Sequence, residues 1–242
     1  MDKESFEKNI YQNWTQHFGQ PVETARKHGT TLSPEKKYEG DKIVVLEYIG
    51  KHTFIQVDPS YFEALSDLVK RVPAKLSING DHIRRVWSEK AIQSHHFGKT
   101  YYLYPPDLPP YTPVAPFYLR KLTEADRDAM SILHADNTPE DVDEGFVEVT
   151  HQIAFGCFLD KQLVAASSGY ERTGFLDIGV LTHPEFRKKG LGKAVVGALC
   201  DWAAQNDIIA QYRHDAENIN SQKVALSLNF KIYFTTEAIT FR

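Results

Sequence analysis

The spacing of apolar residues in the second half of the chain alternates between the period of a strand and that of a helix. Extended apolar runs predict strands over 117–122, 153–159, 163–168, 175–182 and 208–212, with one or two closing strands within 230–241. Apolar residues at i, i+3 and i+4 predict an amphipathic helix over 190–205, with shorter helices after Thr123 and Pro139 and another over 220–228. Because helices and strands interleave, we expect this half to fold as an α+β domain.

The first half predicts a smaller α+β unit without a motif that carries chemistry. Its pattern indicates helices over 4–18 and 22–28, a helix that begins at Pro59 after the cap residue Asp58, and a strand over 99–104. Two β-rich runs, 43–49 and 52–57, flank Gly50-Lys51 and predict a hairpin.

A proline-rich segment separates the two halves. Six of the twelve prolines fall within residues 104–116, and each proline fixes φ and removes a backbone donor, so neither a helix nor a central strand can pass through. We predict a linker over 105–116 that joins an N-terminal domain, residues 1–104, to a C-terminal domain, residues 117–242. A docking site for a proline-recognition domain is the alternative interpretation.

The composition is that of an ordinary globular protein, with 42% hydrophobic and 25% charged residues. A formal net charge of -4 lacks the basic excess typical of nucleic-acid-binding proteins, so no nucleic-acid partner is expected. The sequence opens without an apolar stretch of signal-peptide length, and no segment approaches the roughly 18 apolar residues of a spanning helix. We therefore expect a cytoplasmic protein with no membrane partner.

The cysteines and histidines predict no metal site. Cys157 and Cys200 are the two cysteines, and both lie in apolar patterns typical of core positions. None of the ten histidines forms a ligand cluster, and the pair His95-His96 is expected at the surface.

The chemically informative stretch runs from the predicted strand 175–182 into the helix 190–205. The first turn of a helix leaves N–H groups without intrahelical partners and carries partial positive charge. Gly190 and Gly192 allow a diphosphate to approach the backbone closely. Positive charge is added by Arg187, Lys188, Lys189 and Lys193. The stretch fits neither a P-loop, because Ala194 follows Gly192-Lys193, nor a dinucleotide fingerprint, because Val195 occupies the third glycine position.

Arg187-Lys188-Lys189-Gly190-Leu191-Gly192 resembles the Arg/Gln-x-x-Gly-x-Gly/Ala signature of the GNAT superfamily of N-acetyltransferases. Downstream, Asn218-Ile219-Asn220-Ser221 and Leu228-Asn229-Phe230 are similar to the family's Asn-x-x-Ser/Ala helix that ends in Gly-Phe. The order of elements from Phe117 onward is similar as well. The resemblance covers 117–242 and implies a central mixed, mostly antiparallel sheet flanked by helices. The N-terminal unit is then either a degenerate GNAT-like half or a stabilising or dimerising appendage.

The resemblance implies acetyl-CoA as cosubstrate and assigns the residues that hold it, without a metal. The backbone of Val180, Leu181 and Thr182 would bind the pantetheine arm in a gap beside their strand, and an amide near Leu181 would stabilise the oxyanion. The pyrophosphate would lie on Arg187, Lys188, Lys189, Gly190, Leu191 and Gly192, with Lys193 nearby. Asn218 and Ser221 would flank the arm near the sulfur. The reaction would be direct attack of an acceptor amine on the thioester.

An attacking amine must first lose a proton, and the sequence offers Asp177, His183 and Glu148 as alternative bases. Two positions depart from the family pattern. Ala225 stands where many relatives have a tyrosine that protonates the leaving thiolate, so Tyr233 becomes the candidate acid. Asn229 replaces the glycine of Gly-Phe, and asparagine also tolerates left-handed geometry.

Three hypotheses about function stay open at this point. The first is an N-acetyltransferase that acts on an amine of a small molecule or peptide. The second is a catalytically degenerate acyl-CoA-binding sensor or scaffold, and the third is a transferase for acyl groups larger than acetyl. The sequence does not identify the acceptor. It is compatible with a homodimer and does not decide the oligomeric state.

Overall fold

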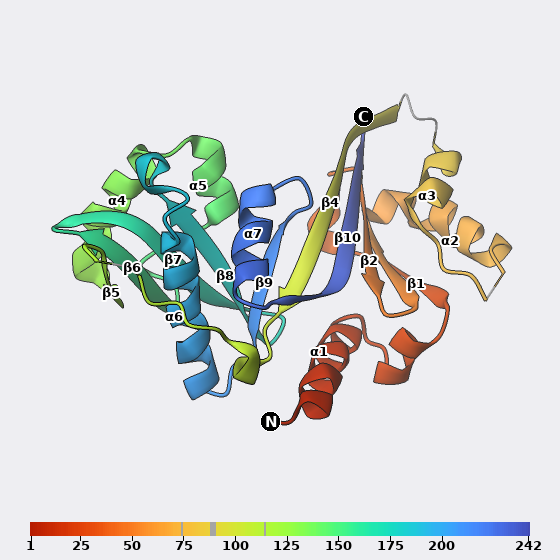
Figure 1. The fold of residues 1–242 in the computed structure, drawn as a ribbon. Coiled ribbons are helices and arrows are strands. Elements are labelled where there is room, and N and C mark those ends of the chain that lie inside the picture. Colours follow the sequence, from red (N-terminus) through yellow and green to blue (C-terminus); the bar gives the residue numbers. More distant parts are fainter. Residues whose placement is uncertain (74, 88–90, 114) are drawn as a thin grey trace. The chain divides into compact units, whose positions relative to one another are not determined.

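The computed structural model describes residues 1–73, 75–87, 91–113 and 115–242. The fold is mixed α+β, with one 10-stranded mixed sheet in the order β1-β3-β2-β10-β4-β9-β8-β7-β6-β5 (Figure 1). The strands are β1 (Gly29–Pro34), β2 (Ile43–Ile49), β3 (His52–Val57), β4 (Ile92–Tyr102), β5 (Tyr118–Lys121), β6 (Ile153–Leu159), β7 (Gln162–Arg172), β8 (Phe175–Thr182), β9 (Ala210–Asp215) and β10 (Lys231–Phe241). The helices are α1 (Lys3–His17), α2 (Phe62–Arg71), α3 (Gly80–Val86), α4 (Arg127–Ala135), α5 (Pro139–Gly145), α6 (Leu191–Gln205) and α7 (Ile219–Ser227).

The chain divides into two compact units whose boundary falls inside β4. The first comprises Met1–Thr100, Asp215–Glu217 and Ile232–Arg242, and the second comprises Tyr101–His214 and Asn218–Lys231. A separate N-terminal domain is therefore not what the structure shows, because the last strand of the chain, β10, pairs antiparallel with β2 of the first unit. The predicted linker holds a short 3₁₀ turn over Pro105–Asp107, and Val114 lies outside the described residues.

Most elements predicted from periodicity are confirmed. The hairpin forms as β2 and β3 with the predicted limits, and β8 covers the predicted 175–182. The capping box of Thr123 and Asp126 is present ahead of α4. The predicted helix over 22–28 is instead a 3₁₀ turn, Val22–Arg26. Asn229 has φ +63° at the end of α7, as the left-handed cap requires.

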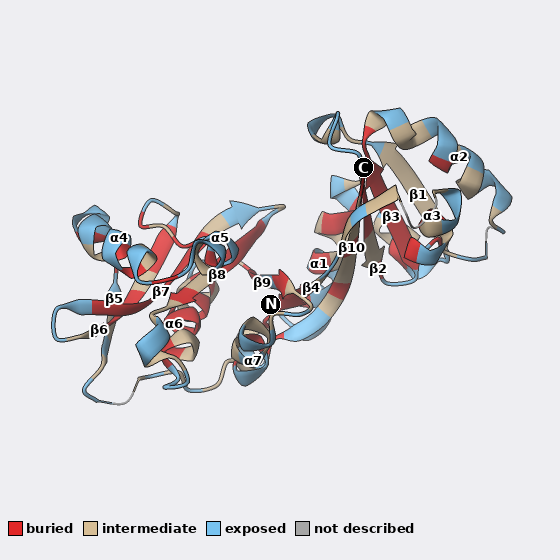
Figure 2. Ribbon diagram, turned by 90° about the horizontal axis from the view of Figure 1, so that it is seen from above, coloured by how far each residue is buried: buried red, intermediate tan, exposed pale blue. Residues whose placement is uncertain are grey.

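The second unit is a sheet covered on both faces, and its buried residues line the strands (Figure 2). On one face α4 packs Met130 and Leu133 against β6, β7 and β8. On the other face α6 packs Leu191, Ala194 and Val195 against the alternate residues of β6 and β7. Side chains of one strand alternate between the faces, so the sequence of β8 contributes to both cores.

Both cysteines are buried, as the sequence predicts. Cys157 lies on β6 and packs against α6, and Cys200 lies on α6. Burial raises the pKa of the Cys157 thiol to about 12 and raises the pKa of Cys200 as well. At neutral pH neither thiol is a nucleophile.

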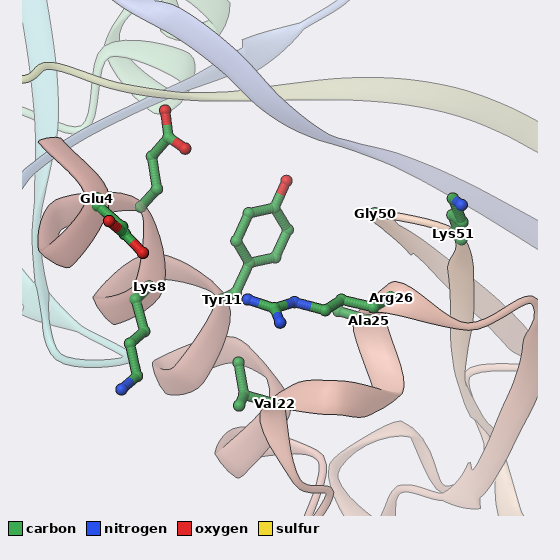
Figure 3. A pocket seen from close by; sticks show the side chains of 9 residues that line it. Glu4, Lys8, Tyr11, Val22, Ala25, Arg26, Gly50 and Lys51 are labelled. Atoms are coloured by element: carbon green, nitrogen blue, oxygen red, sulfur yellow. The ribbon is translucent and has the colours of Figure 1, made fainter.

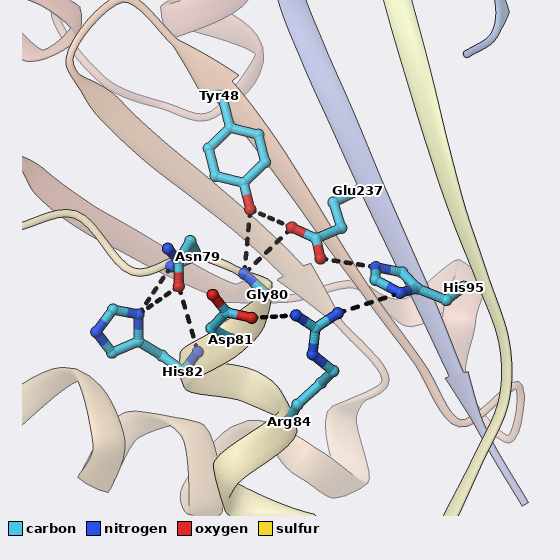
Figure 4. A network of polar contacts seen from close by, with 8 residues as sticks. All are labelled: Tyr48, Asn79, Gly80, Asp81, His82, Arg84, His95 and Glu237. Carbon is cyan, nitrogen blue, oxygen red and sulfur yellow. Dashed lines mark hydrogen bonds and ion pairs between the residues drawn. The ribbon is translucent and has the colours of Figure 1, made fainter. Parts of the chain in front are cut away.

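The first unit contains a buried carboxylate network that the sequence does not predict (Figure 4). Glu237 on β10 accepts hydrogen bonds from Tyr48 Oη, from the Gly80 N–H at 3.1 Å and from His95 Nε2 at 2.7 Å. A Cβ at Gly80 would lie 1.7 Å from the Glu237 carboxylate, so a side chain at the start of α3 would displace Glu237 from this network. The sequence predicts both His95 and His96 at the surface. This is wrong for His95, whose ring pairs with Glu237, and His96 is exposed as predicted.

Candidate functional site

A gap opens in the second unit where two neighbouring parallel strands separate. The register between β8 and β9 runs from the rung Leu176–Ala210 to the rung Ile178–Tyr212. Beyond that rung β8 continues to Thr182 and β9 to Asp215, and no further pairing joins the two strands, all of whose residues are described. Backbone groups along the separated edges are free to bind a ligand.

The backbone direction along β8 tells which residues face this gap. The N–H of Leu176 donates to the Ile209 carbonyl at 3.0 Å, so it points toward β9. Because N–H directions alternate along a strand, the backbone of Val180 and Thr182 also faces the β9 side. The backbone of Leu181 faces β7, so it is not directed toward the gap.

The gap leads into a cleft of about 400 Å³. Its walls come from the end of α5, the outer half of β8, the start of α6, strand β9 and helix α7. The cleft is lined by Asp141, Glu144, Gly145, Ile178, Gly179, Val180, Leu181, Thr182, Phe186, Arg187, Lys188, Gly190, Leu191, Gly192, Lys193, Tyr212, Arg213, Asn218, Asn220, Ser221, Lys223, Val224 and Ser227. Every residue predicted to hold the cofactor is in this set except Lys189.

The loop before α6 presents backbone N–H groups at one end of the cleft. Lys188 and Gly190 have φ values of +64° and +77°, and helical hydrogen bonding begins with the Ala194 N–H, which donates to Gly190. The first-turn N–H groups of the helix therefore lack intrahelical partners. A Cβ at Gly190 would meet nothing within 4 Å, so space for a ligand remains above it.

Gly192 lies on the floor of the cleft. A Cβ there would lie 3.5 Å from Thr182 Oγ1 and 3.5 Å from Val224 Cγ2, which are ordinary contacts. A methyl group is therefore tolerated at this position, whereas a longer side chain would extend between β8 and α7.

Positive charge is in excess along the cleft. Lys188, Lys193 and Lys223 make no ion pair with any described residue. The guanidinium of Arg187, by contrast, bonds Asn137 Oδ1 at 2.9 Å and Asp141 Oδ2 at 3.0 Å. Three uncompensated ammonium groups beside free N–H groups suit an anion with several charges.

Lys189 points elsewhere and does not line the cleft. Its Nζ lies 4.7 Å from the centroid of the Phe186 ring and 6.0 Å from that of Phe117. Such distances are those of a cation–π contact, so this lysine packs on the aromatic residues behind the loop.

Helix α7 brings Asn218 and Ser221 to the opposite wall. Asn218 caps the helix by accepting from the Ser221 N–H at 2.9 Å, and its Nδ2 donates to Glu144 at 2.6 Å. The hydroxyl of Tyr212 on β9 lies beside Ser221 and makes no hydrogen bond of standard geometry with any described residue, although the side chain is 1% exposed. Burial raises the pKa of Tyr212, and Ser221 offsets part of that rise.

Asp177, the first base candidate, is a buried member of an ion pair. Its carboxylate accepts from Arg213 Nε at 2.9 Å and Nη2 at 2.6 Å, and from the Tyr170 hydroxyl at 2.9 Å. All three donors bond the same oxygen, Oδ2, and the pairing with Arg213 gives this carboxylate the environment of a structural anion.

The other catalytic candidates lie in different surroundings. His183 accepts from the Glu185 N–H and lies 3.4 Å from Asp136. The backbone of Glu148 donates to Ser168 Oγ, beside β7. Tyr233 lies on β10 in the first unit, where its ring contacts Phe6, Tyr11 and Phe234.

Sequence reasoning missed Tyr212 and Lys223 at the cleft. Tyr212 is an aromatic residue in a strand, which by pattern is simply a core position, and Lys223 is a lysine on a helix face. The register that ends at Tyr212 identifies it, and no sequence pattern predicts where a strand pair separates.

A second cavity of about 520 Å³ lies within the first unit, beside α1 and the turn of β2 and β3. Tyr11 and Arg26 lie on its walls, with Glu4, Lys8 and Lys51 (Figure 3). Charges of both signs line it, and its described lining residues include no helix start with a glycine-rich loop like the one before α6. Among the described residues no group of three or more histidines, cysteines or carboxylates is placed to hold a metal, and no helix has the length and hydropathy to cross a membrane.

Comparisons with known proteins agree with this geometry. Residues 146–239 match the family model described as GNAT acetyltransferase. No curated protein matches the sequence.

Solved structures share the fold at low sequence identity. A GCN5-related N-acetyltransferase from Sphaerobacter thermophilus is 9% identical, with a TM-score of 0.56 over 96% of this chain and 90% of that one. An acetyltransferase of the GNAT family from Colwellia psychrerythraea is 14% identical, with a TM-score of 0.53 over 79% and 78%. A GCN5-related N-acetyltransferase from Kribbella flavida is 15% identical, with a TM-score of 0.50 over 66% of this chain and 63% of that one. Over residues 146–239 the chain is therefore similar to GNAT acetyltransferases, and its fold is shared with the solved structures named above.

Proposed function

We propose that the protein transfers an acetyl group from acetyl-CoA to the amine of an acceptor in a ternary complex. The observation that carries the proposal is the gap between β8 and β9. It leads to helix α6, which begins after Gly190, and to three lysines that make no ion pair with a described residue. A thioester attached through a long polar arm to a diphosphate needs both features in one continuous cleft.

The residues of the cleft fit the two ends of acetyl-CoA. The pyrophosphate would lie on the free N–H groups at the start of α6, with Lys188 and Lys193 beside it. The amide groups of the pantetheine arm would hydrogen-bond the backbone of Val180 and Thr182. The arm would thus take the place that β9 would occupy if the two strands stayed paired. Arg187 would hold the loop through Asp141 rather than contact phosphate.

Tyr212 is the proton donor that we propose for the leaving thiolate. Its hydroxyl is buried in the cleft wall between the last β8–β9 rung and Ser221. Burial raises its pKa, so the hydroxyl is protonated at neutral pH, as a donor to the leaving sulfur must be. This places the acid on β9, whereas the position on α7 holds Ala225, which is fully buried.

An acyl-CoA-binding sensor without turnover is the second candidate function. It is favoured by the ion pair of Asp177 with Arg213, because this predicted base is committed to structure. A sensor would bind acetyl-CoA in the same cleft, so binding does not separate the two candidates.

Turnover separates them. The protein is incubated with acetyl-CoA and a panel of primary amines, and release of the free thiol is followed together with the mass of the acetylated amine. An enzyme releases thiol in proportion to the acetylated product. Binding of acetyl-CoA without any product across the panel would support the sensor and contradict the transferase.

A further inference from the structure

Three aromatic side chains form a continuous wall in the second unit, on the side of the sheet that carries α5. The ring centroids of Phe146 and His151 are 5.0 Å apart, those of His151 and Tyr170 are 5.1 Å apart, and those of Phe146 and Tyr170 are 5.2 Å apart. The rings contact one another in a triangle, so a ligand would lie on their common outer surface. We call these three residues the aromatic wall.

Phe146 combines an exposed side chain with an uncommon backbone conformation. It ends α5 with φ +43°, in the left-handed region that favours glycine or asparagine, and its side chain is 51% exposed. Uncommon backbone conformations cluster at functional sites, and this one places an exposed ring beside two further aromatic side chains. Tyr170, beside it, is fixed by the hydrogen bond from its hydroxyl to Asp177.

His151 is the imidazole of the wall, the side-chain type that exchanges a proton near neutral pH. Its Nδ1 lies 2.8 Å from Ser168 Oγ, and that oxygen also accepts from the Glu148 N–H at 3.0 Å. In the tautomer that donates Nδ1–H to Ser168, the lone pair of Nε2 is available, and Nε2 bonds no described residue. Burial lowers the pKa of His151, and the Glu148 carboxylate partly offsets this.

The aromatic wall borders the cleft at three points. Phe146 follows the cleft-lining Gly145, and a Cβ at Gly179 would lie 2.7 Å from the Phe146 carbonyl oxygen. Ser168, the partner of His151, pairs with Gly179 across β7 and β8. Gly179 immediately precedes Val180, whose backbone faces the gap. The wall thus stands one residue from the strand edge at which the thioester arm would bind.

Resting on the proposed function, we infer that the aromatic wall is the acceptor site, that it takes an amine carried on a flat aromatic group, and that His151 accepts the amine proton. The rings supply stacking surface for the aromatic group. The ammonium is attracted both to the ring faces and to Glu148, whose carboxylate lies near enough to act on His151. Asp177 adds no net charge there, because Arg213 neutralises it.

The proton transfers balance. The bound ammonium gives one proton to His151 Nε2, and the neutral nitrogen then forms its bond to the acetyl carbon. The bond from that carbon to sulfur breaks, and the thiolate takes a proton from Tyr212. The second proton of the nitrogen reprotonates Tyr212, directly or through water, and His151 releases its proton to solvent. The products are the amide, the free thiol and one proton.

Binding is tested by titrating the protein, saturated with coenzyme A, with tryptamine and with 3-indolepropionate, which has the same ring but a carboxylate. Phe146→Asn removes the ring and suits a left-handed residue, so its fold is retained. Ile132→Asn, on the exposed face of α4, is the matched control. We expect tryptamine to bind the wild type and Ile132→Asn alike, at least tenfold more weakly to Phe146→Asn, and 3-indolepropionate to bind at least tenfold more weakly than tryptamine.

The base is tested by the pH dependence of kcat for tryptamine in the wild type and in His151→Gln, which keeps a donor toward Ser168. Because the pKa of His151 is lowered and its neutral form is the base, the wild-type rate should fall only as pH drops below 6.5. His151→Gln should lack this limb and lose roughly 100-fold in kcat.

The proposal is overturned if tryptamine fails to bind or to be acetylated, if Phe146→Asn binds it like the wild type, if the carboxylate binds as well as the amine, or if His151→Gln keeps the limb. These outcomes leave acetyl-CoA binding intact. Failure of the wild type to bind acetyl-CoA would instead remove the proposed function itself.

Discussion

Tyr212 and Ile178 form the last rung between β9 and β8, and immediately beyond them the two strands separate. The side chain of Tyr212 is 1% exposed at this point, with a hydroxyl that makes no standard hydrogen bond to any described residue. A buried hydroxyl without a partner costs stability, so its position at the head of the cleft favours a chemical role.

Tyr212→Phe separates this chemical role from packing, because only the hydroxyl is removed. If the hydroxyl protonates the leaving thiolate, kcat should fall roughly 100-fold while the KM for acetyl-CoA changes little. Steady-state kinetics with a responsive amine measures both. An unchanged kcat would exclude Tyr212 as the acid.

The same variant should not lose stability. The hydroxyl gains no standard hydrogen bond in the folded protein, so removing it relieves a desolvation cost of about 1 kcal/mol. We expect Tyr212→Phe to unfold in urea at an equal or higher midpoint than the wild type. A clear loss of stability would mean that the hydroxyl has a bonding partner in solution.

Asp177 should act in stability rather than as a base. Asp177→Asn leaves Arg213 without its carboxylate, and we expect a loss of about 2 kcal/mol in the free energy of unfolding. This is below the range for fully buried pairs, because the Arg213 side chain is 36% exposed. Urea denaturation measures the loss. The double variant Asp177→Asn, Arg213→Met should recover part of it, whereas an additive loss would contradict the pairing.

The pH dependence of stability should carry the signature of Asp126. Hydrogen bonds from Arg120 lower the pKa of this carboxyl to about 2, from an ordinary 3.8. Because the pKa is lower in the folded protein than in the unfolded chain, the ionised carboxyl stabilises the fold above pH 3.8. This contribution to the free energy of unfolding, about 2 kcal/mol, disappears as the pH falls from 3.8 toward 2. Asp126→Asn should therefore be less stable at pH 7, by a margin that shrinks over this range. A margin independent of pH would contradict the assignment.

Local patterns predict the starts of two helices that line the cleft. Gly190 and Gly192 identify the start of α6, and the Asn218-x-x-Ser221 spacing identifies the start of α7, because both depend on residues close together in the sequence. The directions of the side chains, by contrast, depend on tertiary contacts that local patterns do not predict. Lys189 and Arg187 belong to the same signature, but Lys189 packs on Phe186 outside the cleft, and Arg187, although it lines the cleft, pairs with Asp141.

Long-range pairing is what the sequence does not predict. β10 is readily identified as a strand, yet its pairing with β2 across nearly the whole chain decides which unit it joins. The same holds for Tyr212 and His151, whose significance depends on where β8 and β9 separate and on a serine of β7. The spacing of apolar residues predicts the helices and strands. The register between strands that are distant in sequence decides which polar side chains lie close together.

The central claim is that the cleft at the start of α6 binds acetyl-CoA. Isothermal titration of the wild type with acetyl-CoA tests it most directly, with Gly192→Glu as the disruptive variant and Gly192→Ala as its control. The glutamate would place a long, negatively charged side chain on the cleft floor, whereas a methyl group makes only ordinary contacts there. We expect micromolar binding by the wild type and by Gly192→Ala, and no measurable binding by Gly192→Glu. Absence of binding by the wild type, or equal binding by Gly192→Glu, would contradict the account.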